Sequence, residues 1–562
     1  MTNQTLIRKW ALQNAVKYGG KANPGAIIGK LLAEHPELKN EMKTLSQDIQ
    51  KIVKEVNSLA PEKQRHELEQ EAPELLVEKK KEETHELPEL KNAVPGKVIT
   101  AFPPEPSGVA HIGHVSGALF NMLYAQRYNG KFYLRFEDTN PELGREEFQE
   151  SITKELQLMG LKWDKVINIS DTMPEMYVAA EKLLKKGLLY ACSCQVDDMR
   201  ANRASGTECE HRNQTPEQNM RVWNELLDRK HAKGTYVVRY KGNMTDSNSV
   251  MRDPTMFRII DAEHYRQGKN YLLWPSYDFA AAFSDGNEGI THRVRSKEFE
   301  LRAELQRELQ QHMGFTQTII VEQARINLEG VEASKRKIRD RITAGELTGW
   351  EDIRLTTLPA LRRRGFTPQG IKQFLLNVGI TKNERTLGWA SLEAENRKIL
   401  DPVVNRYFFI QEPVKITIAK APEQTADVAF HPEHPEQGRA SFKTHTEFYL
   451  AKKDVEELKQ RSLYRLMDCL NFTKTTKGYA FNTLDHEAYK EKGKKIMHWL
   501  PYDPAQTTAV EVLMPDATQV TGLGDARLQK LKVGDIVQFT RFGFVRLDEK
   551  RADKLVFWYG HK

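Results

Sequence analysis

Apolar and polar residues alternate along residues 98–141 in a way that predicts a strand, a helix and a second strand. A short apolar run at 98–102 ends at two prolines, and a helical pattern then extends from 111 to about 127. A second apolar run follows at 131–136. A strand, a glycine-containing turn, a helix and a parallel strand form a βαβ unit, whose ligands bind past the carboxyl ends of the strands. The pattern therefore predicts an α/β fold with a ligand site near the start of this helix.

The same alternation continues down the chain, with one interruption. Helical patterns at 145–159 and 173–187 extend the unit, and a polar, cysteine-bearing stretch at 189–250 then breaks it. We interpret that stretch as an inserted domain. The alternation resumes through a strand at 252–259, an apolar segment at 271–299, a helix at 299–313, a strand at 317–321 and a loop that carries Ser334, Lys335 and Arg336.

The two ends of the chain have different patterns. Residues 1–94 predict a separate helical module, with a Gly-Gly break after the first helix, a third helix at 39–59 and a densely charged linker at 78–86. Residues 339–411 are also helical. From residue 412 onward, short alternating strands are separated by Gly, Pro and Asp turns, a pattern that predicts β-barrels.

Composition narrows the class of protein. The 562 residues imply several domains, and the formal net charge of +7 is compatible with a polyanionic partner without requiring one. No apolar run approaches the roughly 20 residues of a membrane-spanning helix, and the start lacks the apolar core of a signal peptide. Four cysteines in so long a chain indicate a reducing compartment. We therefore expect a cytoplasmic, soluble, multidomain protein that has no membrane partner.

The predicted ligand site contains two histidines at the start of its helix. His111 and His114 are three residues apart, so they share roughly one helical face. The helix N-terminus offers unpaired N–H groups and a positive dipole end to a phosphate, and the imidazoles can donate to phosphoryl oxygens. Gly113 has no β-carbon, so a flat base could approach the backbone closely. For an isolated motif of this kind, a pair of capping histidines is an equally good interpretation.

The motif is not isolated. FPPEPSG before it and LRFEDTNP after it resemble the first signature of the glutamyl/glutaminyl branch of class I aminoacyl-tRNA synthetases, and VEASKRK at 331–337 resembles the second signature of that class. The helical start and the β-rich tail resemble the archaeal/eukaryotic type of glutamyl-tRNA synthetase. The resemblance covers nearly the whole chain.

The resemblance implies a multidomain α/β fold built around a Rossmann-type catalytic domain. That domain would occupy residues 95–188 and 251–338, interrupted by an acceptor-end-binding domain at 189–250. The remaining parts would be a helical N-terminal extension at 1–94, a helical connecting domain at 339–411 and a β-barrel anticodon-binding region at 412–562.

The resemblance also implies an activity, in which ATP and Mg²⁺ activate an amino acid that is then joined to tRNA. Catalysis of this kind is positioning and charge neutralisation. His111 and His114 would serve the reacting phosphate, and Lys335 with Ser334 the pyrophosphate side. The second signature departs from the family pattern, because Glu332 and Ala333 occupy its first two positions. A solvated basic turn is the alternative interpretation of this loop.

Substrate residues carry over from the family by position. Gly113, Arg325 and Leu328 match positions beside the nucleotide, and Glu105 and Ser107 in FPPEPSG are assigned to the substrate side.

The amino-acid pocket decides the substrate. Glu137 matches the residue that binds the α-ammonium group, and Tyr277 matches the tyrosine at the side-chain end. Glutamate enzymes of the branch have an arginine where Arg295 stands, and a guanidinium pairs with a carboxylate far better than with an amide. We therefore expect L-glutamate as the amino acid.

One pocket position departs from the family. An arginine that helps to hold the substrate side chain is replaced here by Ala101. In an extended strand alternate residues share a face, so Arg293 would point the same way as Arg295. We hypothesise that Arg293 supplies the missing charge from the opposite wall of the pocket. The alternative is that Arg293 faces solvent or tRNA phosphate.

The inserted stretch carries a candidate metal site. Cys192, Cys194, Cys209 and His211 form a C-x-C-x14-C-x-H pattern, which could complete a tetrahedral zinc site of a kind known in the family. The alternative is a cluster of reduced thiols. Cys469 is expected in a core.

Basic residues elsewhere have two interpretations each. The helical N-terminal module could contact tRNA or present a solvated face, and the arginines at 362–364 are expected to be a solvated helix end. In the β-rich tail, Arg541, Phe542, Phe544 and Arg546 could stack on anticodon bases, although half of an alternating strand must be core.

The expected partner is tRNA(Glu), and tRNA(Gln) stays open as a second one. Two other functions remain as alternatives. A glutaminyl enzyme is opposed by Arg295, and a non-catalytic tRNA-binding relative of the synthetases is opposed by the intact signature residues.

Overall fold

The computed structural model describes residues 3–17, 19–34, 42–72, 75, 87–330, 334–383 and 385–562 of the chain. It divides into two compact units, Met1–Thr84 and His85–Lys562. The predicted linker at 78–86 lies outside the described residues, and so do residues 331–333 of the second signature.

The first unit is a small helical bundle, as predicted. Its core contains Trp10, Ile49 and Leu68, all buried. The buried amide of Gln64 donates to the backbone carbonyls of Gly20 and Val56, which joins the Gly-Gly turn to the rest of the bundle. The helices are α1 (Asn3–Lys17), α2 (Pro24–Glu34), α3 (Met42–Asn57) and α4 (Pro61–Glu71).

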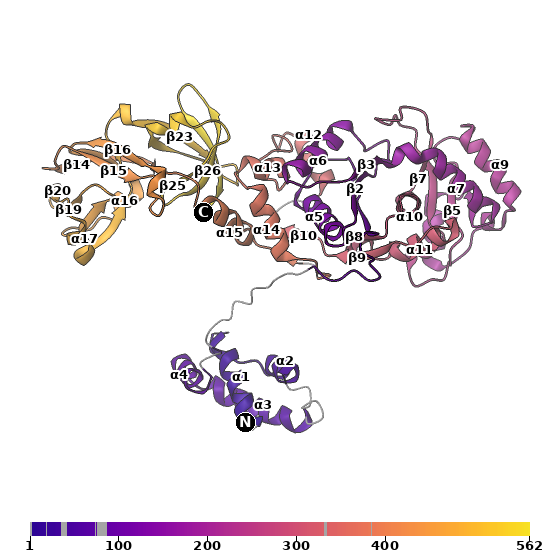
Figure 1. Cartoon of the computed structure of the whole chain (residues 1–562), viewed down its shortest axis with the longest axis horizontal. Helices are drawn as coiled ribbons and strands as arrows, with labels where there is room; N and C mark the ends of the chain where they lie inside the picture. Colours follow the sequence, from indigo (N-terminus) through magenta and orange to yellow (C-terminus); the bar gives the residue numbers. More distant parts are fainter. Residues whose placement is uncertain are drawn as a thin grey trace. The chain divides into compact units, whose positions relative to one another are not determined.

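The second unit begins with the predicted βαβ arrangement (Figure 1). Strands β1 (Ile99–Phe102), β2 (Lys131–Phe136) and β3 (Lys165–Asn168) are parallel neighbours in that order. Helices α5 (Ile112–Arg127) and α6 (Glu146–Leu158) connect them.

A second parallel pair lies beside this sheet. Strand β8 (His292–Ser296) pairs with β9 (Ile319–Gln323), and Thr291 exchanges hydrogen bonds with Ile99 at the start of β1. The buried amide of Asn121, on α5, both donates to and accepts from the backbone of Val294. Helix α5 is therefore held against β8 as well as against β1 and β2.

The inserted region is an antiparallel sheet in the order β4-β5-β6-β7. It continues past residue 250, because the segment expected to resume the parallel alternation at 252–259 pairs antiparallel with β5 instead. The alternation therefore resumes only at β8. The elements are β4 (Leu189–Cys192), β5 (Val237–Tyr240), β6 (Thr255–Ile259) and β7 (Leu273–Pro275), with α7 (Met173–Lys185), α8 (Val196–Ser205), α9 (Pro216–Leu227), α10 (Tyr277–Asn287) and α11 (Arg302–Met313) around them.

A helical region connects the parallel strands to the tail (Figure 1). Its arginines are not a solvated helix end, which corrects the expectation for 362–364. Arg362 pairs with Glu155, Arg363 pairs with Asp548, and Arg364 is buried. The elements are β10 (Ile326–Leu328), α12 (Lys335–Thr343), α13 (Leu358–Arg363), α14 (Pro368–Val378), β11 (Arg385–Leu387) and α15 (Trp389–Leu400).

The tail consists of two seven-stranded sheets, ordered β12-β25-β26-β27-β23-β24-β13 and β21-β18-β19-β20-β14-β17-β22, and the separate hairpin β15-β16. The strands are β12 (Arg406–Tyr407), β13 (Phe409–Gln411), β14 (Pro413–Ala419), β15 (Gln424–Ala429), β16 (Arg439–Thr444), β17 (Glu447–Ala451), β18 (Leu463–Leu466), β19 (Asn471–Thr475), β20 (Gly478–Thr483), β21 (Gly493–Met497), β22 (Leu500–Pro501), β23 (Thr507–Leu513), β24 (Gln519–Asp525), β25 (Ile536–Phe539), β26 (Gly543–Lys550) and β27 (Leu555–His561). Two short helices, α16 (Lys452–Glu456) and α17 (His486–Lys492), complete it.

The aromatic and basic candidates of the tail are partly structural. Phe544 is buried, as is Cys469, which was expected in a core. Phe542 packs partly buried against the core of the first sheet. Arg541 is paired with Asp454, so its charge is already neutralised.

Arg541 also contacts a buried histidine that is sensitive to pH. The Nε2–H of His498 donates to the carbonyl of Phe409 at 2.8 Å, and its Nδ1 faces a guanidinium nitrogen of Arg541 at 3.3 Å. Both ring nitrogens are therefore used by the neutral form. Burial lowers the pKa of His498 to about 4, and the charge of Arg541 acts in the same direction, against the Phe409 hydrogen bond and the Asp454 charge.

We predict that this histidine makes the protein less stable in mild acid. Because the folded pKa lies below the usual value of 6.5, the unfolded chain binds the proton first as the pH falls. The contribution of His498 to the free energy of unfolding is therefore fully present above pH 6.5 and is lost as the pH falls from 6.5 to about 4. The thermal midpoint of the His498→Asn variant should fall less steeply over this range than that of the wild type. His445→Asn, at an exposed histidine, should keep the wild-type slope; equal slopes in all three proteins would contradict the assignment.

Candidate active site

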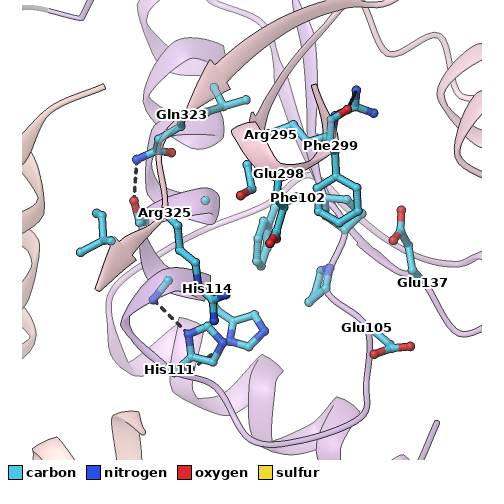
Figure 2. Close-up of a pocket in the computed structure, with 18 of the residues that line it drawn as sticks. Phe102, Glu105, His111, His114, Glu137, Arg295, Glu298, Phe299, Gln323 and Arg325 are labelled. Carbon is cyan, nitrogen blue, oxygen red and sulfur yellow. Dashed lines mark hydrogen bonds between the residues drawn. The ribbon is translucent and has the colours of Figure 1, made fainter. Parts of the chain in front are cut away.

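A cavity of about 530 Å³ lies where the parallel strands end and α5 begins. Figure 2 shows His111, His114 and Arg325 on one side of it and Glu137, Arg295 and Phe299 on the other. The cavity brings together most of the residues predicted from sequence, namely Glu105, His111, Gly113, His114, Glu137, Tyr277, Arg293, Arg295, Arg325, Ser334 and Lys335.

Two predicted residues do not line the cavity. Leu328 lies in β10, where it pairs with Leu387 and packs into the core under α5, and its neighbour Ile326 lines the cavity instead. Ser107 is buried behind the wall and donates to Glu105 at 2.6 Å. The roles assigned to both residues from sequence therefore stay predictions.

The two histidines cap the helix and line the cavity at the same time. The backbone N–H of Gly113 donates to Nδ1 of His111 at 3.1 Å, and the backbone N–H of His111 donates to Nδ1 of His114 at 3.0 Å. A neutral imidazole whose Nδ1 accepts a hydrogen bond carries its proton on Nε2. The capping interpretation is thus correct, and it also fixes which nitrogen of each ring can donate.

Both histidines are neutral in this setting. Burial, with the charges of Lys335 and Arg325, lowers the pKa of His111 to about 3. Burial and the neighbouring His111 hold the pKa of His114 well below its usual range. Gly113 is needed for this arrangement, since a Cβ there would lie only 2.9 Å from Cε1 of His111.

Lys335 enters the cavity from a helix, not from the loop that the sequence predicts. Ser334 caps α12 by accepting the backbone N–H of Lys337, so Lys335 is the first residue of that helix. Its Nζ lies 3.5 Å from the carbonyl of Glu105, and Arg339 of the same helix donates to the carbonyl of Ser107 at 2.6 Å. Burial lowers the pKa of Lys335, against the charge of Glu105.

On the opposite side, Glu137 and Tyr277 lie near two arginines. Arg293 donates to Glu137 at 3.3 Å, and the ring of Tyr277 lies 5.0 Å from that of Phe299. Burial raises the pKa of the Glu137 carboxyl, although Arg293 and Arg135 oppose it. Burial also lowers the pKa of Arg295.

Arg293 faces neither solvent nor an exposed RNA-binding surface, because it is almost fully buried. It donates to both carboxylate oxygens of Asp285, at 3.1 and 3.3 Å. Its strand, β8, lies next to β1, which carries Ala101, so the side chain does not come from an opposite wall as we expected. Ala101 is fully buried.

A buried ion cluster that was not predicted from the sequence lies behind the cavity. Arg135 pairs with Asp285 at 2.7 Å and with Glu288 at 3.0 Å, and the side chains of Arg135 and Asp285 are fully buried. Burial raises the pKa of Asp285, but Arg293 and Arg135 outweigh it and hold the carboxyl below its usual range. The sequence did hold a sign of this cluster, because Arg135 stands inside an apolar strand and Asp285 inside an alanine-rich helix.

The chain matches three models of one protein family. Residues 97–402 match the family model of the catalytic domain of class I (E and Q) tRNA synthetases. Residues 404–483 and 496–548 match two models of the anti-codon binding domain of the same synthetases. The chain belongs to the class I E and Q tRNA synthetases.

Curated members of this synthetase family resemble the chain along its full length. A glutamate–tRNA ligase of Pyrococcus furiosus is 38% identical over 577 residues, covering 100% of both chains. A glutamate–tRNA ligase of Methanothermobacter thermautotrophicus is 35% identical over 560 residues, covering 100% of this chain and 99% of the relative. A solved glutamate tRNA ligase of Elizabethkingia meningosepticum is 20% identical, with a TM-score of 0.41, and the match covers 55% of this chain and 70% of that chain.

Membership of this synthetase family confirms the predicted multidomain α/β class and implies ATP and Mg²⁺. It also implies tRNA and an amino acid as partners. In the part of the chain that the structure describes, no helix is both long enough and apolar enough to cross a membrane.

The synthetase also carries the predicted cysteine cluster, in the antiparallel region. One ligand atom from each of Cys192, Cys194, Cys209 and His211 lies within 4.8 Å of the others. The sulfur atoms of Cys192 and Cys209 are 3.9 Å apart, and Cys194 Sγ lies 3.4 Å from Nδ1 of His211. Arg239, buried behind them, donates toward the sulfur atoms of Cys192 and Cys209. These distances suit a tetrahedral metal site of three thiolates and one imidazole.

Proposed function

We propose that this synthetase joins L-glutamate to tRNA(Glu). The glutamate α-carboxylate attacks the α-phosphorus of ATP and pyrophosphate leaves. A terminal hydroxyl of the tRNA then attacks the carbonyl of the glutamyl-adenylate, and AMP leaves. The observation that carries the choice of amino acid is Arg295, a buried guanidinium on the wall of the cavity beside Tyr277. The full-length relatives bear the name glutamate–tRNA ligase, which agrees with that choice.

In this proposal the cavity has an amino-acid end and a phosphate end. At the amino-acid end, Glu137 binds the α-ammonium group, and Arg295 with Tyr277 binds the side-chain carboxylate. A carboxylate offers two acceptor oxygens to a guanidinium, whereas an amide offers one acceptor and turns an NH₂ donor toward the other N–H, so glutamine binds less well.

At the phosphate end, His111 and His114 donate from Nε2 to oxygens on the α-phosphate. They can do so without a proton from solution, because the capping hydrogen bonds already fix the donor nitrogen. Lys335, supported by Ser334, neutralises the departing pyrophosphate. Gly113 and Arg325 lie beside the nucleotide, and Mg²⁺ arrives on the triphosphate, as is usual for this ion.

The remaining regions take the roles expected from their positions in the chain. The antiparallel region receives the acceptor end of the tRNA, and the two large sheets of the tail receive the anticodon. The N-terminal helical unit makes an accessory contact with tRNA. Whether tRNA(Gln) is a second substrate depends on the anticodon contacts.

We predict that the purified protein charges total tRNA with radiolabelled glutamate and not with glutamine. Lys335→Ala should fold normally and lower the rate of charging by about 10²–10³, because one electrostatic donor is lost from the pyrophosphate side. Lys337→Ala, an exposed lysine on the same helical turn, should keep a near-normal rate and serves as the matched control.

Three results would each reject a different part of this proposal. Glutamine charging would identify a glutaminyl enzyme. No charging by a folded protein that still binds tRNA would identify a non-catalytic relative. Full activity of Lys335→Ala would remove Lys335 from the reaction.

We further propose that the cysteine cluster holds one structural Zn²⁺. The purified protein should then contain about one equivalent of zinc by elemental analysis. Cys209→Ser should lose the metal and lower the thermal midpoint, because the four ligands join β4 to the segment before α9. Cys469→Ser, at a buried cysteine outside the cluster, should retain the metal. Wild-type protein that is metal-free and fully stable would rule out the site.

Arg293 is proposed as the second guanidinium of the amino-acid pocket, in place of the family arginine at Ala101. It lines the cavity and already contacts Glu137. The adjacency of β1 and β8 and the full burial of Ala101 support this proposal.

Arg293→Ala should therefore raise the KM for glutamate by roughly one to two powers of ten, as for a lost charged hydrogen bond. Adding Ala101→Arg to that variant should restore much of the affinity, because the guanidinium returns from the adjacent strand. Arg293→Lys reports whether the charge alone suffices. If Arg293→Ala folds, as judged by circular dichroism, and its glutamate KM is unchanged, Arg293 has no part in binding.

A further inference from the structure

A buried glutamine connects the ion cluster to the amino-acid pocket. Gln306 lies on α11 and is almost completely buried. Its side-chain NH₂ donates to Asp285 at 2.5 Å, and its carbonyl oxygen accepts from Arg295 at 2.7 Å. One amide thus bridges the carboxylate that holds the cluster together and the guanidinium that reads the substrate side chain.

The chemistry of the two partners requires a group that both donates and accepts hydrogen bonds, and the amide of Gln306 is such a group. An ionised carboxylate only accepts hydrogen bonds and a guanidinium only donates them, so the bridging group must offer a donor on one side and an acceptor on the other. This requirement also fixes the orientation of the amide, with nitrogen toward Asp285 and oxygen toward Arg295. An apolar side chain would leave buried polar groups on both sides short of a partner.

The three arginines of this region differ in what neutralises them. Arg135 and Arg293 both pair with Asp285, and each has a second carboxylate nearby. In the described part of the chain, the hydrogen-bond acceptors of Arg295 are neutral, namely the amide of Gln306, the carbonyl of Phe299 and the hydroxyl of Tyr277. Gln306 therefore orients Arg295 without cancelling its charge, which stays available to an anionic ligand.

We infer that Gln306 is a specificity-determining positioning residue of the amino-acid pocket. Its hydrogen bond to Asp285 fixes the amide, and the amide oxygen in turn keeps the Arg295 guanidinium oriented toward the side-chain carboxylate of the substrate. It does not touch the reacting atoms. This inference rests on the proposed choice of glutamate as the substrate, which depends on the orientation of Arg295.

The test uses the full-length protein with Gln306→Met, which keeps the length and most of the volume of the side chain. The KM for glutamate should rise roughly tenfold, the scale expected when a hydrogen bond to a charged group is lost. The kcat for charging and the KM for ATP should stay within about twofold, because the phosphate end is unchanged. The ratio of kcat/KM for glutamate to that for glutamine should fall.

A double-mutant comparison separates positioning from general structural support. If Gln306 acts through Arg295, then adding Gln306→Met to an Arg295→Ala variant should not lower kcat/KM for glutamate any further. Independent, additive losses in the two variants would overturn the inference.

A matched control is present one turn further along the same helix. Gln310 is also buried, and its amide bonds to the carbonyl of Ala282 and to Thr318, away from the arginines. Gln310→Met should lower thermal stability by a comparable amount and leave the glutamate KM unchanged. A rise in the glutamate KM of Gln310→Met equal to that of Gln306→Met would show that any loss of packing in α11 has this effect, and would overturn the inference.

The wild-type protein distinguishes this inference from the proposed function. If the wild type does not charge tRNA with glutamate, the proposed function fails and the inference fails with it. If the wild type prefers glutamate but Gln306→Met keeps the wild-type KM and selectivity, only the role of Gln306 is rejected.

Discussion

The carboxylate of Asp285 is the constraint on which the amino-acid end of the active site depends. It lies on α10 and receives hydrogen bonds or ion pairs from Arg135 of β2, Arg293 of β8 and Gln306 of α11. Four elements therefore meet at one fully buried group. Removing a partner from such a cluster costs several kcal/mol, about 3–5 for a broken buried pair, because a charge is left without compensation. Strands β2 and β8 are thus linked by charge pairing through this one carboxylate.

The phosphate end depends on a different constraint, the N-terminus of α5. Its first N–H groups need acceptors, and the histidine rings supply them through Nδ1. The same hydrogen bonds place the remaining proton of each ring on Nε2, so a structural requirement of the helix determines the donor available to a phosphate. The same hydrogen bonds cap the helix and leave Nε2–H free to donate, so the two interpretations of these histidines do not exclude each other.

The parts of this structure that were predictable from sequence are those set by neighbouring residues. The βαβ unit follows from the alternation at 98–136, and the signature residues mark the cavity because they stand at the ends of its strands. The parts that were not predictable depend on partners far along the chain. Leu328 packs in the core because β10 pairs with β11, some sixty residues later, and short apolar runs do not reveal that β6 is antiparallel. Arg135 and Asp285 are separated by an entire inserted region, so only the unusual placement of their charges hinted at a pair.

The connecting helices contact both helix α5, at the active site, and strand β27, at the end of the tail. Arg364 lies against the rings of Trp389 and Phe366 and donates to the carbonyl of Gly560 on β27, and burial lowers its pKa to about 10. On their other side, residues of α14 and α15 pack into the same core as the start of α5. Since a guanidinium is charged even at this pKa, its charge is solvated there by aromatic faces and backbone carbonyls in place of a carboxylate. The hydrogen bond from Arg364 to Gly560 is directional, so it fixes the orientation of β27 relative to the connecting helices in addition to the packing between them. The connecting helices are consequently in contact with both regions: Arg364 binds the carbonyl of Gly560 on β27, and Leu358 at the start of α13 donates to the carbonyl of Ala110 beside α5.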